Sequence, residues 1–303
     1  VGNLEGFASE RSAGKEIETP FGKKTIQLFE LEKVQNYDII FLSVGGSFSE
    51  QYAKALTEKG AVVIDKSSVF RYDDDVPLVI PEINPEAVQG KRLIASPNCT
   101  TSILAVALYP IYKEFGLKKT IVSTYQATSG AGKAGMDELL EQSKNYLDGK
   151  PVENEAFAYP IPFNIIPHID KFQENLYTKE EMKMVWETQK IFGVRDLPIS
   201  CTSVRIPTFR SHAESVTIET EKPVDPDRVR DLLKEAPGVE VVDNPEQNRY
   251  PMPIQTNEKF DVEVGRIRQN KLFGEYGLDF FVCGDQLLKG AALNGVQIAH
   301  LFV

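Results

Sequence analysis

The sequence predicts an α/β protein with two domains, and three observations lead to that class. The chain has 303 residues, which is long enough for two cores. Between residues 38 and 128, short apolar strands alternate with helical stretches, a pattern typical of parallel strands joined by right-handed crossovers. From 198 to 268, strand patterns surround one helical segment, which indicates an α+β domain with a largely antiparallel sheet.

The first region contains four apolar segments that we expect to be strands, at 38–44, 61–66, 92–96 and 119–129. Helical patterns at 49–60 and 103–115 lie between them. Gly45 and Gly46 follow the first of these strands and precede a helix, so their backbone N–H groups are predicted to face the phosphate or ribose of a ligand. A Gly-Gly pair also serves any tight turn, so this signal is weak by itself.

The second region begins with an apolar, proline-rich stretch at 158–170, which predicts an ordered irregular loop. Thr178 then opens an amphipathic helix that runs to residue 192, with acidic residues in its first turn. Strands are expected at 215–220 and 260–268, with a helix at 225–236 between them. The last helix, at 284–302, has a face of small residues that predicts close packing: Gly290, Ala291, Ala292 and Gly295.

Composition excludes several classes of function. The net charge of −10 disfavours a nucleic-acid partner, because the summed field repels a polyanion. No apolar run approaches the roughly 20 residues that span a bilayer, and no signal segment opens the chain, so we expect a cytoplasmic protein without membrane contact. The three cysteines are too widely spaced for a metal site or a disulfide framework, and Cys201 and Cys283 are expected to pack in the core.

Cys99 is the first candidate for chemistry, in the segment "ASPNCTTS" at 95–102. Pro97 and Asn98 end a strand, and the hydroxyl residues at 100–102 are predicted to cap the following helix. Cys99 thus falls at the start of a helix, where unpaired N–H groups and the helix dipole favour a thiolate. The structural alternative is a small buried residue below the helix start.

His212 is the second candidate, in "RIPTFRSHAESVTIE", where two arginines and a histidine recur within eight residues of a strand–loop–strand. Histidine titrates near neutral pH and often serves as a general acid or base. A lone histidine is more often a structural residue, and its position alone does not decide between the two roles.

Five segments taken together resemble the aspartate-β-semialdehyde dehydrogenases. They occur in family order over nearly the whole chain: "ASERSAGK" at 8–15, "SPNCTT" at 96–101, "YQATSGAG" at 125–132, "EEMKMVWETQKI" at 180–191 and "RIPTFRSHAES" at 205–215. The resemblance implies a Rossmann-like, NADP-dependent oxidoreductase that interconverts L-4-aspartyl phosphate with L-aspartate 4-semialdehyde and phosphate. That reaction lies in lysine, threonine, methionine and isoleucine biosynthesis.

The resemblance also implies roles for particular residues. Cys99 is the nucleophile that forms a thioester, His212 the acid and base, and Gln126 orients the intermediate. Arg205 is implied to bind the substrate α-carboxylate and Glu180 the α-ammonium. The resemblance also implies that phosphate is bound by Arg71, Asn98 and Lys183.

Structural alternatives exist for two of these residues. Glu180 is also explained as a first-turn carboxylate favoured by the helix dipole, and so is Glu181. Arg71 is also explained by an ion pair with the acidic residues 73–75.

For the cofactor, the resemblance implies that Arg11, with the hydroxyls of Ser9 and Ser12 on either side, binds the adenosine 2′-phosphate. A site for this phosphate indicates NADP as the cofactor. A polar turn after a strand is the structural alternative. No metal is expected. The residues implied at the cofactor are Ser9, Arg11, Ser12, Gly45, Gly46, Ser129, Gly130, Gly132, Gln286 and Asn294.

The first residues depart from the family pattern, which opens with a strand, a "GxTGxxG" turn and a helix before the serine–arginine motif. Here only "VGNLEGF" precedes "ASERS". We therefore expect that this strand, most of the loop and the helix are missing from the sequence, and that Gly2 and Asn3 are not bonded neighbours.

The domains are predicted at 1–98 for NADP binding and 99–284 for catalysis and dimerisation, with helix 285–303 packed back onto the first domain. The small-molecule substrate and inorganic phosphate are the expected partners, in a homodimer or homotetramer. Three alternatives stay open: an N-acetyl-glutamyl-phosphate reductase, a reductase of a coenzyme A thioester such as malonyl-CoA, and a non-catalytic homologue that binds or assembles.

Overall fold

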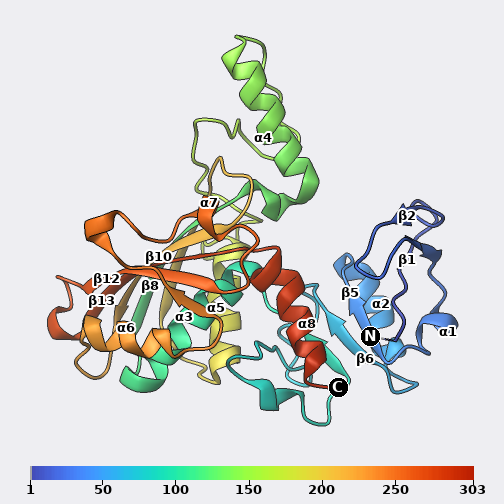
Figure 1. Ribbon diagram of the computed structural model, residues 1–303, viewed down its shortest axis with the longest axis horizontal. Coiled ribbons are helices and arrows are strands. Elements are labelled where there is room, and N and C mark those ends of the chain that lie inside the picture. The colour runs from blue at the N-terminus through green and yellow to red at the C-terminus, as the bar shows by residue number, and fades with distance from the viewer. Residues whose placement is uncertain (1) are drawn as a thin grey trace.

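The structure is a computed structural model, and it describes residues 2–303. It contains a three-stranded parallel sheet, a six-stranded mixed sheet and two small two-stranded sheets (Figure 1). The α/β class predicted from the sequence is confirmed. Within the described residues, no helix is both long enough and apolar enough to cross a membrane.

The parallel sheet lies in the first part of the chain and has the order β5 (Ile39–Leu42), β6 (Val62–Asp65), β7 (Leu93–Ala95). Helix α2 (Gly46–Leu56) makes the crossover from β5 to β6, and the short helix η1 (Pro85–Val88) precedes β7. All four residues of β6 are buried, as expected for a central parallel strand covered on both faces. These three strands confirm the predicted alternation.

The fourth predicted strand, at 119–129, does not join the parallel sheet, so this part of the prediction is wrong. Strand β8 (Lys119–Gln126) belongs to the six-stranded sheet, where it pairs antiparallel with β10 (His212–Glu219) and parallel with β9 (Ile199–Arg205). The helix before it, α3 (Cys99–Phe115), contacts β12 and β13 and so carries the chain into the second sheet. An apolar strand–helix–strand pattern does not reveal which sheet receives the next strand.

The six-stranded sheet has the order β11 (Val239–Val241), β12 (Val262–Gln269), β13 (Gly277–Gly284), β10, β8, β9. Three of its pairings are antiparallel and two are parallel, so the expected largely antiparallel sheet is a mixed one. Its inner face packs against α3, α5 (Lys179–Phe192) and α6 (Pro226–Lys234). Its outer face leaves the apolar side chains of Ile121 and Tyr125 exposed.

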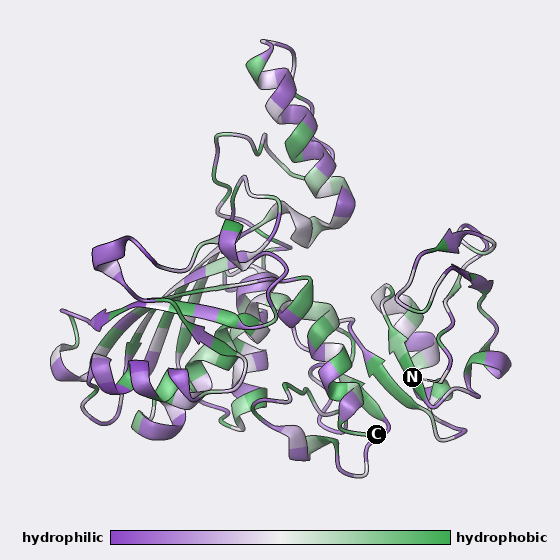
Figure 2. Cartoon of the chain, viewed as in Figure 1, coloured by the Kyte–Doolittle hydropathy of each residue, from purple (hydrophilic) through white to green (hydrophobic). Residues whose placement is uncertain are grey.

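Helix α5 begins as the sequence predicts. The Thr178 hydroxyl accepts from the Glu181 N–H, and the Glu181 carboxylate accepts from the Thr178 N–H, which makes a capping box. The predicted irregular loop before it is also present. Helix α4 (Gly132–Leu147) follows the single turn η2 (Thr128–Ala131) and extends away from both sheets (Figure 1); apolar and polar residues are mixed along it (Figure 2).

The last helix has two parts, the π-helical turn η5 (Leu288–Ala292) and α8 (Leu293–His300). Ile298 and Ala299 pack on the parallel sheet in a cluster with Val62, Ile64 and Ile94. The chain therefore returns from the second sheet to the first.

Small elements complete the description. Residues 2–6 form irregular backbone, and the strand, the glycine-rich turn and the helix that the family pattern places before the serine–arginine motif do not occur in them. The expected separation of Gly2 and Asn3 stays a prediction. The remaining elements are β1 (Phe7–Ala8), β2 (Glu16–Ile17), β3 (Lys24–Thr25), β4 (Gln27–Leu28), α1 (Leu31–Val34), η3 (Pro245–Gln247), α7 (Pro253–Thr256) and η4 (Gly274–Tyr276).

Candidate active site

Cys99 is the first residue of α3, and Asn98 is its N-cap. The Asn98 Oδ1 accepts from the N–H groups of Thr100 and Thr101, at 3.0 and 3.2 Å. The prediction that hydroxyls at 100–102 cap the helix is thus wrong, because the amide one residue before the helix already satisfies these donors. The placement of Cys99 at a helix start is confirmed.

Glu180 lies in the first turn of α5 and is the centre of a buried hydrogen-bond network. Its Oε1 accepts from Asn98 Nδ2 at 3.1 Å, Gln126 Nε2 at 3.1 Å and Thr100 Oγ1 at 3.4 Å. Its Oε2 accepts from Lys183 Nζ at 2.9 Å. Burial by itself would raise the Glu180 pKa, but the Lys183 ammonium and these donors lower it, so the group is a carboxylate. The network contacts make Glu180 more than a first-turn carboxylate on the helix dipole.

Arg205 ends β9 and is 6% exposed. Its Nη1 donates to the carbonyl oxygen of Ala127 at 2.6 Å, and the guanidinium lies over the Phe157 ring at 5.7 Å. It forms no ion pair with a carboxylate of residues 2–303, and burial lowers its pKa. A buried guanidinium without an anionic partner is costly, and an anionic ligand would satisfy it.

The Cys99 residue is partly exposed. Desolvation of its thiol by the surrounding protein raises the thiol pKa to about 11. The Glu180 carboxylate raises it further, whereas the Thr100 hydroxyl and the cations Arg205 and Arg71 lower it. The thiolate that the helix start alone predicts is therefore disfavoured by burial of the thiol. Reactivity depends on what else binds beside the sulfur.

His212 is fully buried at the start of β10, and its Nδ1 accepts from the N–H of Ala127 at 3.0 Å. The ring proton must then lie on Nε2, which has no partner in residues 2–303. Burial, followed by the charge of Arg205, lowers the His212 pKa to about 3. His212 is thus arranged to donate from Nε2, and acceptance of a proton would require loss of the Ala127 contact.

Cys99 and His212 share an electrostatic environment although they are far apart in the sequence. The charges of Glu180 and Arg205 act on the pKa values of both side chains. A Cβ atom on Gly130 would lie 2.9 Å from Arg205 Nη1 and 3.4 Å from His212 Nε2, so this glycine backbone also closes around the site.

The expected phosphate residues lie next to this centre but already have protein partners. Arg71 pairs with Glu187 of α5 at 2.9 Å, so the predicted alternative, a pair with residues 73–75, is wrong. Lys183 donates to Asp170 at 2.8 Å as well as to Glu180. Sequence reasoning missed both Asp170 and Glu187. Glu187 could have been found, because it lies seven residues after Glu180 on the same helical face.

Two of the expected cofactor segments lie near the parallel sheet. Ser9, Arg11 and Ser12 form a turn after β1, and Arg11 is exposed without an ion pair among residues 2–303. Gly45 is the N-cap of α2 and Gly46 its first residue, and no side chain caps this helix.

Of the other expected cofactor residues, Ser129 and Gly130 lie in η2, Gly132 begins α4, and Gln286 and Asn294 follow β13. Gln286 donates to Ser129 Oγ and accepts from the Ser211 N–H at 2.7 Å, which joins the η2 turn to the start of the His212 strand. Gly132 has φ +75°, a conformation that favours glycine. Asn294 is buried and donates to Val79 O and Ser96 Oγ, at 3.0 and 3.1 Å.

Gly290 of the π-helical turn contacts Cys99 directly, which the sequence indicated only as a helix face of small residues. A Cβ atom on Gly290 would lie 2.8 Å from the Cys99 Cβ and 3.0 Å from its Cα. The last helix therefore touches both the cysteine and the parallel sheet.

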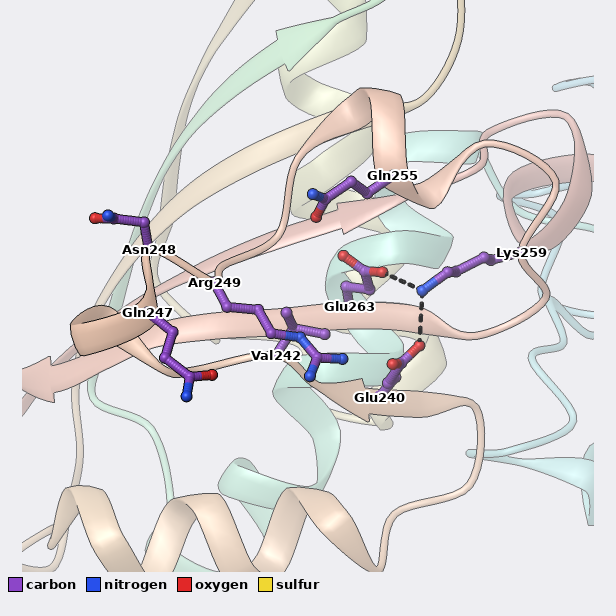
Figure 3. Close-up of a pocket in the computed structure, with 8 residues that line it drawn as sticks. All are labelled: Glu240, Val242, Gln247, Asn248, Arg249, Gln255, Lys259 and Glu263. Atoms are coloured by element: carbon purple, nitrogen blue, oxygen red, sulfur yellow. Dashed lines mark hydrogen bonds and ion pairs between the residues drawn. The ribbon is translucent and has the colours of Figure 1, made fainter.

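A separate open pocket of about 500 Å³ lies on the second sheet, and none of the expected site residues lines it. Figure 3 shows Lys259 between Glu240 and Glu263. The Lys259 Nζ donates to Glu240 Oε2 at 3.1 Å and to Glu263 Oε1 at 2.6 Å. Its cation is therefore already neutralised by two protein carboxylates.

Comparisons with known proteins agree with this geometry. The family model "Semialdehyde dehydrogenase, NAD binding domain" matches residues 1–91, and "Semialdehyde dehydrogenase, dimerisation domain" matches 108–289. The aspartate-semialdehyde dehydrogenase of Aquifex aeolicus is 47% identical, over 100% of this chain and 90% of its own. That of Synechocystis is 44% identical with the same coverage.

Among solved structures, aspartate semialdehyde dehydrogenase II from Vibrio cholerae, complexed with ASA, superposes with a TM-score of 0.94. It is 43% identical and covers 100% of this chain and 90% of its own. Two family models match the chain, and sequence identities of 43–47% extend over its full length. The chain belongs to the aspartate-semialdehyde dehydrogenase family.

Proposed function

We propose that this protein reduces L-4-aspartyl phosphate to L-aspartate 4-semialdehyde through a thioester on Cys99, with NADP as cofactor. The observation that carries the proposal is Arg205, a buried guanidinium without a carboxylate partner in residues 2–303, whose charge acts on the thiol of Cys99. This pairing suits a substrate that has a carboxylate at one end and an electrophilic carbonyl at the other.

Substrate recognition would use opposite charges on the two sides of the ligand. Arg205 binds the α-carboxylate with its planar fork. Glu180 remains ionised beside it and attracts the α-ammonium, although its two oxygens already accept four hydrogen bonds from the protein. Gln126 accepts from Thr124 Oγ1 and donates to Glu180 Oε1, which fixes the orientation of its amide, and in this orientation it would help to position the intermediate.

Acyl transfer begins with attack of the Cys99 sulfur on the acyl carbon. The S–C bond forms, the C–O bond to phosphate breaks, and the thiol proton leaves with the product as hydrogen phosphate. When bound, the reduced nicotinamide would supply a hydride to the acyl carbon. The C–S bond would then break to release the aldehyde, and the Cys99 sulfur would regain a proton from solvent. The high pKa of the thiol means that Arg205 and Arg71 must stabilise the developing sulfur anion during attack.

His212 would act at the carbonyl oxygen. Its Nε2–H is buried, has no partner in residues 2–303 and belongs to a neutral ring, so it donates a hydrogen bond to the oxyanion that forms at the carbon. A full exchange of protons at Nε2, the acid and base role that the resemblance implies, would require the ring to give up its contact with Ala127.

The leaving phosphate would lie against Arg71, Asn98 and Lys183. The Nε of Arg71 is buried without a partner in residues 2–303, which leaves a donor for a phosphate oxygen. Lys183 would share its ammonium between phosphate and its two carboxylates.

NADP would bind along the parallel sheet, and two observations fit it. The uncapped start of α2 at Gly45 and Gly46 offers N–H groups to an anion or ribose, and the exposed Arg11 between Ser9 and Ser12 suits a 2′-phosphate. Ser129, Gly130, Gly132, Gln286 and Asn294 would enclose the nicotinamide end. With the cofactor residues of the parallel sheet before Cys99 and the catalytic residues from Cys99 onward, the two domains would be 1–98 and 99–284.

The assembly would be a homodimer or homotetramer. The exposed Ile121 and Tyr125 on the outer face of the six-stranded sheet support it, because a second copy would cover them. The test is the molecular mass of the protein in solution by light scattering, with Tyr125→Glu expected to shift it toward one chain.

The reaction is tested by phosphate-dependent reduction of NADP with L-aspartate 4-semialdehyde. We expect turnover that requires phosphate and is lost in Cys99→Ala, with cofactor affinity unchanged. N-acetyl-glutamate semialdehyde with phosphate, and malonate semialdehyde with coenzyme A, are the comparison substrates. Faster turnover of either one would overturn the substrate assignment.

A further inference from the structure

We propose that Glu187 is a positioning residue for the phosphate part of the site, and that it acts through Arg71 and the Asn98 peptide. The inference rests on the proposed function, since it assumes that Arg71 binds phosphate. Glu187 lies on α5 four residues after Lys183 and seven after Glu180, so one helical face carries all three charges.

The Glu187 carboxylate is fully buried, and both its oxygens are in use. Oε1 accepts from Arg71 Nη1 at 2.9 Å and from the Tyr72 hydroxyl at 3.3 Å. Oε2 accepts from the backbone N–H of Asn98 at 2.6 Å. One carboxylate thus joins the phosphate arginine to the residue that caps the Cys99 helix.

These contacts orient Arg71 without using up its donors. Nη1 is held by Glu187, and Nη2 donates to the carbonyl oxygen of Lys66 at 2.9 Å. A planar guanidinium fixed at two nitrogens cannot rotate, so the direction of its Nε–H, which has no partner in residues 2–303, is also fixed. The charge of Arg71 also lowers the pKa of Cys99, which places the arginine within electrostatic range of the sulfur.

Glu187 does not itself meet the substrate. Its oxygens are enclosed by protein donors, and its side chain has no exposed surface. Its effect on the reaction must therefore pass through the position of Arg71, where phosphate leaves or attacks.

The test is steady-state kinetics in the phosphate-consuming direction with native protein, Glu187→Gln, Arg71→Ala and the double variant. Glu187→Gln keeps the size of the side chain but removes the charge that fixes Arg71. We expect its KM for phosphate to rise about tenfold and its KM for the semialdehyde to change less than about twofold. In the Arg71→Ala background, Glu187→Gln is expected to add no further rise.

The matched control is Glu181→Gln, which removes another buried carboxylate of α5. Glu181 accepts from the N–H groups of Thr178 and Ser203, at 2.6 and 2.9 Å, and none of its partners is an expected phosphate residue. This variant is expected to lower the melting temperature without separating the two KM values. If Glu187→Gln does not fold, Glu187→Asp carries the test, with an intermediate rise in the KM for phosphate.

Three outcomes would overturn the proposal: equal changes in both KM values, a further rise in the double variant, or an unchanged phosphate KM in Glu187→Asp and Glu187→Gln alike. A native protein that turns over the semialdehyde without any phosphate requirement would instead contradict the proposed function. The native measurement therefore separates the two failures.

Discussion

The backbone N–H of Ala127 donates to Nδ1 of His212 over 3.0 Å and places the ring proton on Nε2. A peptide N–H can only donate, so this contact leaves one neutral tautomer. It connects the end of β8 to the start of β10, the strands on which Gln126 and His212 lie. The same strand pairing that forms the sheet therefore decides which ring nitrogen carries the proton.

The first prediction is that His212 stays neutral, with its proton on Nε2, from pH 8 down to pH 5. Its pKa of about 3 comes from burial and the charge of Arg205. The measurement is a pH titration of histidine ring nitrogens by NMR, which is tractable because the chain has three histidines. The His212→Gln variant assigns the signals. A midpoint near the ordinary value of about 6.5 would contradict the prediction.

The second prediction concerns the thiol of Cys99 in the ligand-free protein. With a pKa of about 11, its alkylation by iodoacetamide should accelerate about tenfold per pH unit between pH 7 and 10. Cys201 and Cys283 are buried, so Cys99→Ser gives the background rate. A rate that reaches its plateau below pH 8 would show that the helix start and the two arginines outweigh burial.

Local patterns predicted much of the fold. The capping signal at Thr178, the strand before Gly45 and the helix after it were readable because they depend on neighbours in the sequence. The sheet that receives β8 was not readable, since pairing with β10 brings together residues about 90 positions apart. Which sheet receives a strand depends on such long-range contacts.

The candidate site shows the same limit. Residue types and the family resemblance led to Cys99, Arg205 and Glu180. The contacts that orient other side chains of the site, such as Glu187 with Arg71 and the Ala127 N–H with His212, join distant segments of the sequence. A helix start alone predicted a thiolate, and desolvation, which depends on the whole fold, reversed that expectation.

The third prediction is that Arg205→Lys lowers kcat/KM for the semialdehyde by about a hundredfold or more. An ammonium keeps the charge but cannot form the paired fork with a carboxylate or reach Ala127 O in the same way. Arg228→Lys, at an exposed arginine, is the matched control and should retain activity. Equal activity of the two variants would remove Arg205 from substrate binding.

The fourth prediction compares two glycines of the last helix. Gly290→Ala adds a Cβ 2.8 Å from that of Cys99, so the cysteine or the π-helical turn must shift, and we expect a loss of about tenfold or more in kcat. In Gly295→Ala the new Cβ meets Phe41 at 3.6 Å, an ordinary contact, and activity should be retained. Thermal unfolding of both variants checks that the fold persists. Equal activity of both would show that the Gly290 contact does not limit the reaction.

The last prediction is that Glu214 makes the folded protein less stable as pH rises. It lies on the inner face of β10, fully buried, and neither carboxyl oxygen has a partner in residues 2–303. Burial raises its pKa well above the ordinary value, so it stays protonated in the folded state. Above about pH 4.5 the unfolded chain loses this proton while the folded chain keeps it, which lowers the free energy of unfolding by about 1.4 kcal/mol per pH unit. Glu214→Gln does not titrate, so its stability relative to the native protein should increase between pH 5 and 8 in urea unfolding. Glu221 is exposed, so the stability of Glu221→Gln relative to the native protein should not change with pH. If the pH profiles of the native protein and Glu214→Gln are parallel, Glu214 is ionised in the folded state and the prediction is wrong.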